Sequence, residues 1–298
     1  MATGAVLVTG TSSGIGYSIA AELPKHGYHV IAAMRSPTVK NATAAAALRT
    51  LAKSSAGRCD VVEIDVTSDA SVAAGVASAI SLAGRLDVLV NCAGIMWLGV
   101  TEAFSVAQLE TVMQTNLYGP FRMLRAVLPT MRAQRSGLAI SVTSIAGRLV
   151  TPGSGIYSAS KFALEALTEA MRYEASSLGI DLILLEPGPF QTKLKANSVP
   201  PEHATIADAY GPLRELQRMM PERMAMLLND PGISTDPRAV TDAIRELIAL
   251  APGKRPIRTT VGLDLRIGEL NRAAAPFQHD YLKAMGLAAT EVLAGQEV

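Results

Sequence analysis

The sequence has little cysteine, few aromatic residues and no excess of either charge. Its 298 residues include two cysteines, Cys59 and Cys92, so no disulfide framework is expected and a reducing compartment is favoured. The net charge of +1 indicates neither nucleic acid nor an anionic membrane as a partner. No apolar run reaches the roughly 18 residues of a membrane span, and no basic segment precedes the first apolar run, Ala5–Val8. These absences predict a cytoplasmic protein without a membrane span or a signal peptide.

Short β-branched runs alternate with helical stretches over most of the chain. Several of these runs are apolar at successive positions, which is typical of strands covered on both faces. The alternation predicts an α/β fold with a doubly wound parallel sheet and right-handed crossovers. The expected strands are Ala5–Thr9, Tyr28–Ala33, Val61–Val66, Asp87–Asn91, Leu138–Thr143 and Ile180–Leu185. The expected helices lie near residues 15–26, 39–54, 68–83, 102–134 and 155–178.

This pattern loosens after Pro187. Residues 195–233 contain five prolines and four methionines, Met219, Met220, Met224 and Met226, and are interpreted as an insertion on the sheet. Asp236-Pro237 indicates a helix start, Arg255–Val261 a seventh strand, and residues 264–285 a last helix. We therefore expect one domain over 1–298, made of a core (1–192), an insertion (193–235) and a C-terminal part (236–298).

A glycine-rich turn follows the first expected strand and precedes a helix. It reads G-x-x-x-G-x-G, from Gly10 to Gly16. Small residues let a backbone approach a pyrophosphate, and the N–H groups of the new helix point toward the phosphates. The turn therefore predicts a nucleotide site, with a plain glycine turn as the alternative. The residues expected to bind are Gly10, Thr11, Ser12, Ser13, Gly14, Ile15 and Gly16.

The end of the second expected strand bears on the choice of cofactor. An acidic residue there would accept a hydrogen bond from the adenosine 2′-hydroxyl, whereas arginine accommodates a 2′-phosphate. The sequence has Met34-Arg35-Ser36 at this point, without an acid. Arg35 and Ser36 therefore predict NADP(H) as the cofactor, with a solvated surface arginine as the alternative.

Three polar residues form a candidate reactive group. Tyr157 and Lys161 are four residues apart, so their side chains share one helical face. A neighbouring ammonium favours the phenolate, so Lys161 is expected to lower the pKa of Tyr157. Ser144, thirteen residues earlier, ends an expected strand at the sheet edge where open α/β folds bind ligands.

With these motifs, the chain closely resembles the short-chain dehydrogenase/reductase family over about residues 4–195, and most of all its hydroxysteroid and retinol dehydrogenase branch. The resemblance implies a Rossmann-type sheet. The segments that carry it are Thr9–Gly16, Asp65-Val66, Asn91–Gly94, Asn116, Ser144, Tyr157, Lys161 and Pro187–Thr192. One departure is Cys92, where the family often has asparagine, and this cysteine is expected to be a small buried apolar residue.

The resemblance implies a role for each catalytic residue. Tyr157 would be the general acid/base, Ser144 would hydrogen-bond the substrate oxygen, and Lys161 would hold the nicotinamide ribose. Asn116 would support a water-mediated proton relay to Lys161, with a helix-kink asparagine as the alternative.

The resemblance also implies further cofactor-binding residues. Asp65 would contact the adenine, with a strand-end cap as the alternative. The other positions are Val66 beside the adenine, Asn91, Ala93 and Gly94 along the adenosine, Pro187 and Gly188 after the sixth strand, and Thr192 at the carboxamide, in addition to Tyr157 and Lys161.

These residues together predict an NADP(H)-dependent oxidoreductase that interconverts a ketone or aldehyde and an alcohol. The insertion is expected to be a substrate lid over the nicotinamide. Its methionines either form an adaptable apolar wall for a steroid, retinoid or lipid-like substrate or pack the segment onto the core. An NAD-dependent alcohol dehydrogenase for smaller or aromatic substrates and a non-catalytic nucleotide sensor are the alternatives. An epimerase-like enzyme is disfavoured by the missing acid at the end of the second strand.

The resemblance also implies a homodimer through helices 102–134 and 155–178. The four dispersed histidines predict no metal site.

Overall fold

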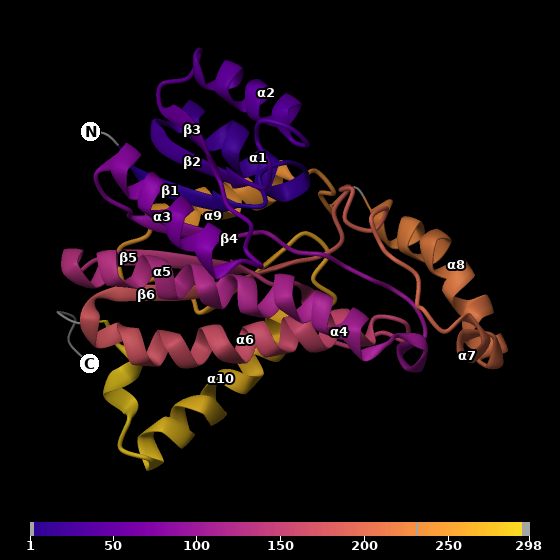
Figure 1. Ribbon diagram of the computed structural model, residues 1–298. Helices are drawn as coiled ribbons and strands as arrows, with labels where there is room; N and C mark the ends of the chain where they lie inside the picture. The colour runs from indigo at the N-terminus through magenta and orange to yellow at the C-terminus, as the bar shows by residue number, and fades with distance from the viewer. Residues whose placement is uncertain (1–2, 231, 294–298) are drawn as a thin grey trace.

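A parallel sheet of seven strands lies at the centre of the computed structural model, which describes residues 3–230 and 232–293 (Figure 1). The strand order is β3-β2-β1-β4-β5-β6-β7, which confirms the doubly wound Rossmann-type fold. The strands are β1 (Thr3–Thr9), β2 (Tyr28–Met34), β3 (Arg58–Glu63), β4 (Val88–Asn91), β5 (Gly137–Val142), β6 (Ile180–Pro187) and β7 (Arg258–Val261).

Two apolar cores cover the two faces of the sheet. Successive residues of β1 point to opposite faces, so Val6 and Val8 enter one core and Leu7 enters the other. The first core is closed by α1 (Gly14–Glu22), α2 (Ala42–Ala52) and α9 (Arg238–Ala249). The second is closed by α3 (Asp69–Ala83), α5 (Gly119–Gln134) and α6 (Gly155–Ala175). Burial on both faces explains the continuous apolar runs in the sequence.

Most predicted elements differ from the structure by a few residues at their ends, and two of them differ more. The third strand is Arg58–Glu63 rather than Val61–Val66, because β3 pairs along β2 from His29↔Arg58 to Met34↔Glu63. The long helix expected at 102–134 is a 3₁₀ turn (Thr101–Ala103), α4 (Val106–Met113), a π-helical turn (Gln114–Tyr118) and α5. Ser105 and Gln108 form a capping box that starts α4 separately.

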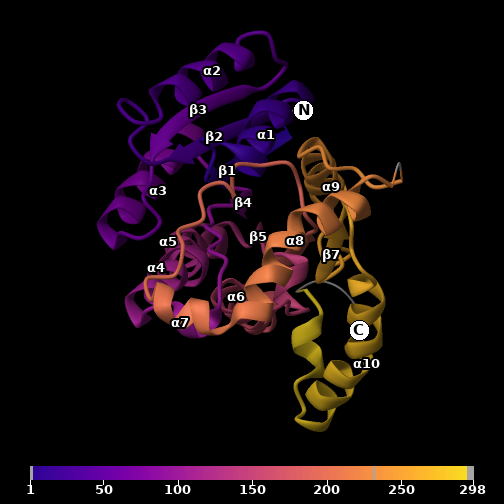
Figure 2. The same cartoon turned by 90° about the vertical axis from the view of Figure 1, so that its right-hand side faces the viewer.

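The segment after β6 forms α7 (Ala204–Ala209) and α8 (Gly211–Leu228), which lie beside the main body (Figure 2). α7 has no buried residue, and Met219 and Met226 of α8 are exposed. Met220 and Met224 of the same helix are half-buried. After α9 and β7 the chain ends in α10 (Ile267–Ala284) and a 3₁₀ turn (Ala288–Glu291).

Candidate active site

The predicted site residues meet at the carboxyl edge of the sheet. β1 lies between β2 and β4, so the crossovers that leave β1 and β4 run to opposite faces and open a crevice between them. Gly10, after β1, faces Ala93, after β4. Its φ is +74°, and a Cβ there would lie 2.8 Å from the Ala93 Cα. Only glycine allows this turn and this close approach.

The rest of the glycine turn closes against two other segments. A Cβ on Gly16 would lie 2.4 Å from the Gly10 carbonyl oxygen, and one on Gly14 would lie 3.3 Å from Thr192 Cβ. The glycine turn and the loop after β6 therefore lie against each other. Thr11 is buried, and its hydroxyl donates to the Ala33 carbonyl oxygen over 3.0 Å, so this side chain braces the turn on β2.

Asn91 carries buried polar atoms without a partner in the described structure. Its side chain is buried, and neither Oδ1 nor Nδ2 has a hydrogen bond there. Such groups are costly unless a ligand or water satisfies them. The adjacent Ala93 N–H is fixed, because it donates to Thr9 Oγ1 over 3.1 Å. The orphaned amide and the glycine cradle therefore fit a bound nucleotide.

Asp65 lies just beyond β3. Its Oδ1 accepts hydrogen bonds from the backbone N–H and the hydroxyl of Thr67, at 3.0 and 2.8 Å. The carboxylate therefore caps a turn, which was the alternative to adenine contact. Its backbone N–H is also engaged, since it donates to Ser71 Oγ over 2.9 Å. Val66, the next residue, is buried against the core on the α3 side.

Next to the end of β2 lies a residue that sequence reasoning missed, Glu63 at the end of β3. Ser36 has a φ of +44°, and its backbone N–H donates to Glu63 Oε1 over 3.2 Å. Arg35 is exposed beside this contact. β2 itself has no acid at its end, but β3 brings the Glu63 carboxylate to the same place. Glu63 reaches this place because it pairs with Met34 in the sheet, and that pairing can be recognised only when the register of β3 against β2 is known.

Tyr157 and Lys161 are buried in the first turns of α6. Lys161 Nζ donates to the Val142 carbonyl oxygen over 3.0 Å and lies 5.9 Å from the centre of the Tyr157 ring. The Ser144 hydroxyl lies near Tyr157 and lowers its pKa, and Ser144 Oγ accepts from the Ala146 N–H over 3.1 Å. A Cβ on Gly94 would lie 3.7 Å from Lys161 Nζ, so the loop after β4 reaches the same cluster.

The pKa of Tyr157 differs from the expectation. Burial raises it above its usual value, while the Ser144 hydroxyl lowers it in part. The expected lowering by Lys161 is wrong for this structure, because the ammonium lies over the ring and donates to Val142. Burial lowers the pKa of Lys161 itself to about 8, with Cys92 and Glu165 opposing the change. Burial also raises the pKa of Cys92 to about 12, so this thiol is neutral.

Asn116 lies in the π-helical turn and is fully buried. Its Oδ1 accepts from Ile95 N–H over 2.8 Å, and its Nδ2 donates to the Ile95 carbonyl and to Ser160 Oγ over 2.8 and 2.9 Å. Ser160 in turn donates to the Tyr157 carbonyl over 2.7 Å. The Asn116 side chain therefore ties the β4 loop to the helix that carries Tyr157. A π turn of this kind is common at functional sites.

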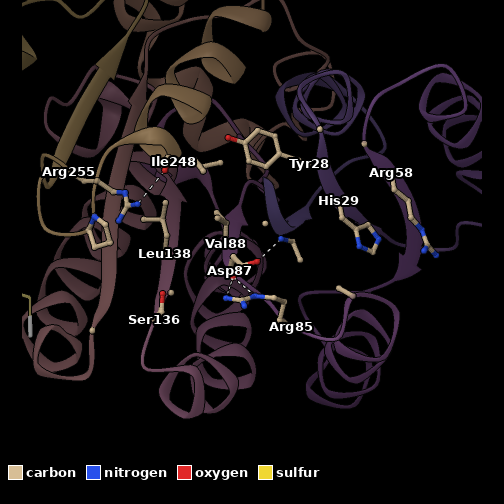
Figure 3. Close-up of a pocket in the computed structure, with 18 of the residues that line it drawn as sticks. Tyr28, His29, Arg58, Arg85, Asp87, Val88, Ser136, Leu138, Ile248 and Arg255 are labelled. Carbon is tan, nitrogen blue, oxygen red and sulfur yellow. Dashed lines mark hydrogen bonds and ion pairs between the residues drawn. The ribbon is translucent and has the colours of Figure 1, made fainter. Parts of the chain in front are cut away.

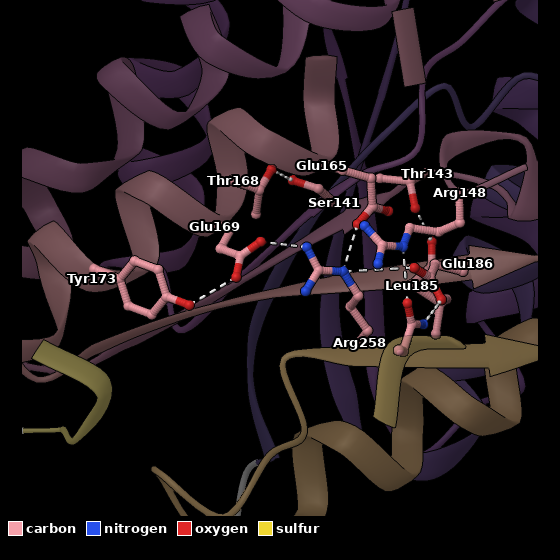
Figure 4. A network of polar contacts seen from close by, with 11 residues as sticks. Ser141, Thr143, Arg148, Glu165, Thr168, Glu169, Tyr173, Leu185, Glu186 and Arg258 are labelled. Atoms are coloured by element: carbon pink, nitrogen blue, oxygen red, sulfur yellow. Dashed lines mark hydrogen bonds and ion pairs between the residues drawn. The ribbon is translucent and has the colours of Figure 1, made fainter. Parts of the chain in front are cut away.

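A buried network of charged residues supports α6 from behind (Figure 4). Arg258 of β7 forms ion pairs with Glu165 and Glu169 of α6 and lies 3.8 Å from Glu186 Oε1 of β6. Asn271 of α10 donates to Glu186 Oε2 over 2.6 Å. Glu165 is one helical turn after Lys161, so the network fixes the helix that holds the catalytic candidates.

A separate cavity of about 760 Å³ opens at the amino edge of the sheet (Figure 3). Its charged side chains have protein partners. Arg85 Nε donates to Asp87 over 2.7 Å, and Arg255 donates to the carbonyl oxygens of Leu247 and Leu250 over 2.8 Å.

Within residues 3–230 and 232–293 there is no group of three or more histidine, cysteine or acidic side chains placed to hold a metal. In the same part of the chain, no helix is long and apolar enough to cross a membrane.

The chain is similar to known oxidoreductases. A family profile described as short chain dehydrogenase matches residues 4–203. Human retinol dehydrogenase 8 is 37% identical over 193 residues, which span 64% of this chain but only 60% of that protein. A 3-ketodihydrosphingosine reductase from Bacteroides thetaiotaomicron is 32% identical over 257 residues, 86% of this chain and 87% of the relative.

A solved structure agrees with this assignment. A short-chain dehydrogenase from Streptomyces avermitilis is 30% identical, with a TM-score of 0.76 over 95% of this chain and 98% of that one. The family match covers most of the sheet, the glycine turn and the Ser144–Tyr157–Lys161 cluster. The chain therefore belongs to the short-chain dehydrogenase/reductase family of oxidoreductases, which use a nicotinamide cofactor.

Proposed function

We propose that this protein is an NADP(H)-dependent oxidoreductase that interconverts a ketone or aldehyde and an alcohol. The observation that carries the proposal is the burial of Tyr157 and Lys161 together on one helix, with Ser144 beside Tyr157, at the sheet edge where the glycine turn lies. A non-catalytic nucleotide sensor would not need all three side chains in this arrangement.

The proton chemistry belongs to Tyr157. A bound nicotinamide cofactor supplies the hydride that adds to the carbonyl carbon. Tyr157 donates its phenolic proton to the carbonyl oxygen, and the Ser144 hydroxyl donates a hydrogen bond to the same oxygen. Because burial raises the pKa of Tyr157, the phenol carries its proton at neutral pH, as a general acid for reduction must. In the oxidation of an alcohol the same oxygen accepts the proton.

Lys161 and Asn116 support this step. With a pKa of about 8, Lys161 can return a proton toward Tyr157 through water near neutral pH. It also holds the nicotinamide ribose in the proposed complex. Asn116 positions α6 through Ser160, and the backbone of its π turn is the proposed start of the water relay.

Arg35 and Ser36 are the proposed ligands of the 2′-phosphate. The exposed guanidinium offers a bidentate partner, and a charge-assisted hydrogen bond contributes roughly 1.5–3 kcal/mol, or about 10- to 100-fold in affinity. Glu63 favours a second candidate, an NAD-dependent alcohol dehydrogenase, because its carboxylate already binds the Ser36 N–H and could accept from a ribose hydroxyl.

The proposed substrate is bulky and apolar, such as a steroid, retinoid or lipid-derived carbonyl. The exposed methionines of α8 provide a flexible apolar surface, with residues 193–235 as the lid. The names of two relatives, a retinol dehydrogenase and a 3-ketodihydrosphingosine reductase, support this class of substrate.

We also propose a cytoplasmic homodimer that pairs through α4, α5 and α6, where Tyr118, Phe121 and Phe162 are exposed.

The test is a carbonyl panel assayed with NADPH and with NADH, followed by the absorbance of the reduced nicotinamide. We expect turnover of apolar ketones or aldehydes, with kcat/KM at least about tenfold higher for NADPH. Equal or better kcat/KM with NADH would reject Arg35 as the phosphate ligand and support the NAD-dependent candidate. Binding of either cofactor without turnover of any alcohol or carbonyl would support the sensor.

A further inference from the structure

The position of Ser144 depends on the 3₁₀ turn that follows it, Ile145–Gly147. The Gly147 N–H donates to the Ser144 carbonyl oxygen over 2.8 Å, and Ser144 Oγ accepts from the Ala146 N–H over 3.1 Å. The Ser144 hydroxyl is therefore tied to this turn, and a displacement of the turn displaces the hydroxyl as well.

The turn is packed closely on α6. A Cβ on Gly147 would lie 3.1 Å from Glu165 Cγ and 3.3 Å from the Lys161 carbonyl oxygen. Gly147 is also buried, so there is little space for a side chain between the turn and the part of α6 that holds Lys161. A loop packed in this way keeps its place only if the residues that follow the turn are held as well.

Arg148, the next residue, connects the loop to α10. Its Nε donates to Asn271 Oδ1 over 2.9 Å, and Asn271 Nδ2 donates to Glu186 Oε2 over 2.6 Å. Glu186 is fully buried in β6, one residue before the strand ends at Pro187. A single amide of α10 therefore joins the loop after β5 to the end of β6, although its two partners are 123 and 85 residues away along the chain.

Asparagine suits this position because its two partners have opposite hydrogen-bonding chemistry. A guanidinium only donates, whereas an ionised carboxylate only accepts. The Asn271 oxygen binds the first and its nitrogen binds the second. The amide also adds no charge to a region where Arg258 is already ion-paired with Glu165 (Figure 4). An aspartate here would repel the Glu186 carboxylate, and a leucine would bind neither partner.

We propose that Asn271 is a positioning residue for Ser144. By holding Arg148 at the end of β6, it fixes the 3₁₀ turn on α6 and keeps the Ser144 hydroxyl beside Tyr157. The inference rests on the proposed function, in which Ser144 donates to the substrate oxygen. Asn271 acts through Arg148 and lies outside residues 4–203, which the family profile matches, so the C-terminal part of the chain contributes to the geometry of the reaction.

A double-mutant cycle with Ser144 tests the proposal in the intact protein. Asn271→Leu keeps the approximate size of the side chain and removes both hydrogen bonds. We expect kcat for carbonyl reduction to fall by about 10- to 100-fold, because a small displacement of a group at the reacting centre causes a loss of this order. The cofactor dissociation constant should stay within a few-fold of the wild-type value. In a Ser144→Ala background the same change should alter kcat by less than about twofold, because the residue through which it acts is absent.

Hydrogen exchange provides a second measurement, which does not require turnover. The N–H groups of Gly147, Arg148 and Leu149 donate within the loop over 2.8, 3.0 and 3.0 Å. Asn271→Leu should accelerate their exchange at least about tenfold, since two hydrogen bonds to charged groups no longer hold the loop. Exchange in β4 should stay at the wild-type rate.

Two further variants complete the test. Arg148→Met breaks the same link from its other end and should reproduce the loss of kcat and the faster exchange. His279→Leu, about two helical turns along α10, removes the contact with Glu291 and should change neither. Equal losses of kcat from Asn271→Leu with and without Ser144, or loop exchange at the wild-type rate, would overturn the proposal. A wild type that turns over no carbonyl, together with faster loop exchange in Asn271→Leu, would reject the proposed function and support the link between α10 and the Ser144 loop.

Discussion

Tyr157 is the residue on which the proposed chemistry depends. Its ring is buried, and Ser144 lies near its hydroxyl, so removal of the hydroxyl oxygen changes the chemistry more than the packing. The proposed roles of Tyr157 and Ser144 can therefore be separated from structural roles by measurements that follow cofactor binding and turnover independently.

Tyr157→Phe should reduce kcat by about 10²- to 10⁴-fold, because the proton donor is lost. The dissociation constant of the reduced cofactor, measured by fluorescence, should stay within a few-fold of the wild-type value. Tyr173→Phe, on the same helix but bonded to Glu169, is the matched control and should keep most of the activity. More than about a tenth of the wild-type rate in Tyr157→Phe would reject the general acid assignment.

Glu63→Gln separates the two cofactor candidates. If a 2′-phosphate binds at Arg35 and Ser36, removal of the nearby negative charge should tighten NADPH binding by about two- to fivefold, since exposed charge pairs contribute up to about 1 kcal/mol. NADH binding should hardly change. Weaker NADH binding with unchanged NADPH binding would mean that Glu63 accepts from the ribose and would favour the NAD-dependent candidate. Glu110→Gln, an exposed acid on α4, is the control.

At the scale of elements, one side chain of α4 holds the first part of the proposed lid (residues 193–235). Gln108 Nε2 donates to the Pro200 carbonyl over 2.9 Å, and its Oε1 accepts from Glu202 N–H over 3.0 Å. Gly99 permits this approach, because a Cβ there would lie 2.3 Å from Pro201 Cγ. The first part of the lid is therefore fixed, which leaves α8 as the part whose apolar residues can adapt.

Gln108→Ala should loosen the lid and raise KM for bulky substrates by up to about tenfold, because each lost hydrogen bond contributes roughly 1 kcal/mol. Cofactor affinity and KM for a small aldehyde should change little. Glu110→Ala on the exposed face of the same helix is the control for α4. If KM rose equally for small and bulky substrates, or if kcat fell equally for both kinds of substrate, Gln108→Ala would be destabilising the whole protein and the lid role would be rejected.

The sequence predicts the elements best where one local pattern determines them. The glycine turn, β6 and α6 are found from apolar runs and motif spacing, and the structure brings Ser144, Tyr157 and Lys161 together as expected. β3 is misplaced because its start depends on pairing with His29 of β2, which no local pattern reports. The Glu63–Ser36 and Gln108–Pro200 contacts join residues 27 and 92 positions apart, so periodicity and spacing could not reveal them.

For the molecule as a whole, the buried charges behind α6 join elements from both ends of the chain. Glu165 and Glu169 of α6, Glu186 of β6 and Arg258 of β7 converge (Figure 4). Asn271 of α10 also donates to Glu186. Glu165 Oε1 and Glu186 Oε1 have no hydrogen-bond partner within the described residues. Three carboxylates near the two guanidiniums of Arg258 and Arg148 leave a negative charge that is incompletely compensated, which is costly in the interior.

Glu186 provides the test of this cost through the pH dependence of stability. Burial, and then the neighbouring Glu165, raises the pKa of Glu186 to about 7, whereas in the unfolded chain it is near 4.5. The folded state therefore holds its proton more tightly than the unfolded state. Stability is fully present below the unfolded pKa and is lost as the pH rises from about 4.5 to about 7. A glutamine at this position stays neutral and avoids that loss.

Glu186→Gln should accordingly leave the free energy of unfolding nearly unchanged at about pH 4.5 and raise it at about pH 8, by at most about 3.5 kcal/mol, since each pKa unit corresponds to about 1.4 kcal/mol. Denaturant titrations of wild type and variant at several pH values measure this difference directly. Glu174→Gln, an exposed residue of α6, should show no such pH dependence. A Glu186→Gln variant that is less stable than wild type at about pH 8 would show that the Glu186 carboxylate is held as a stabilising partner of Arg258, and that the network strengthens the attachment of α6 to the sheet instead of weakening it.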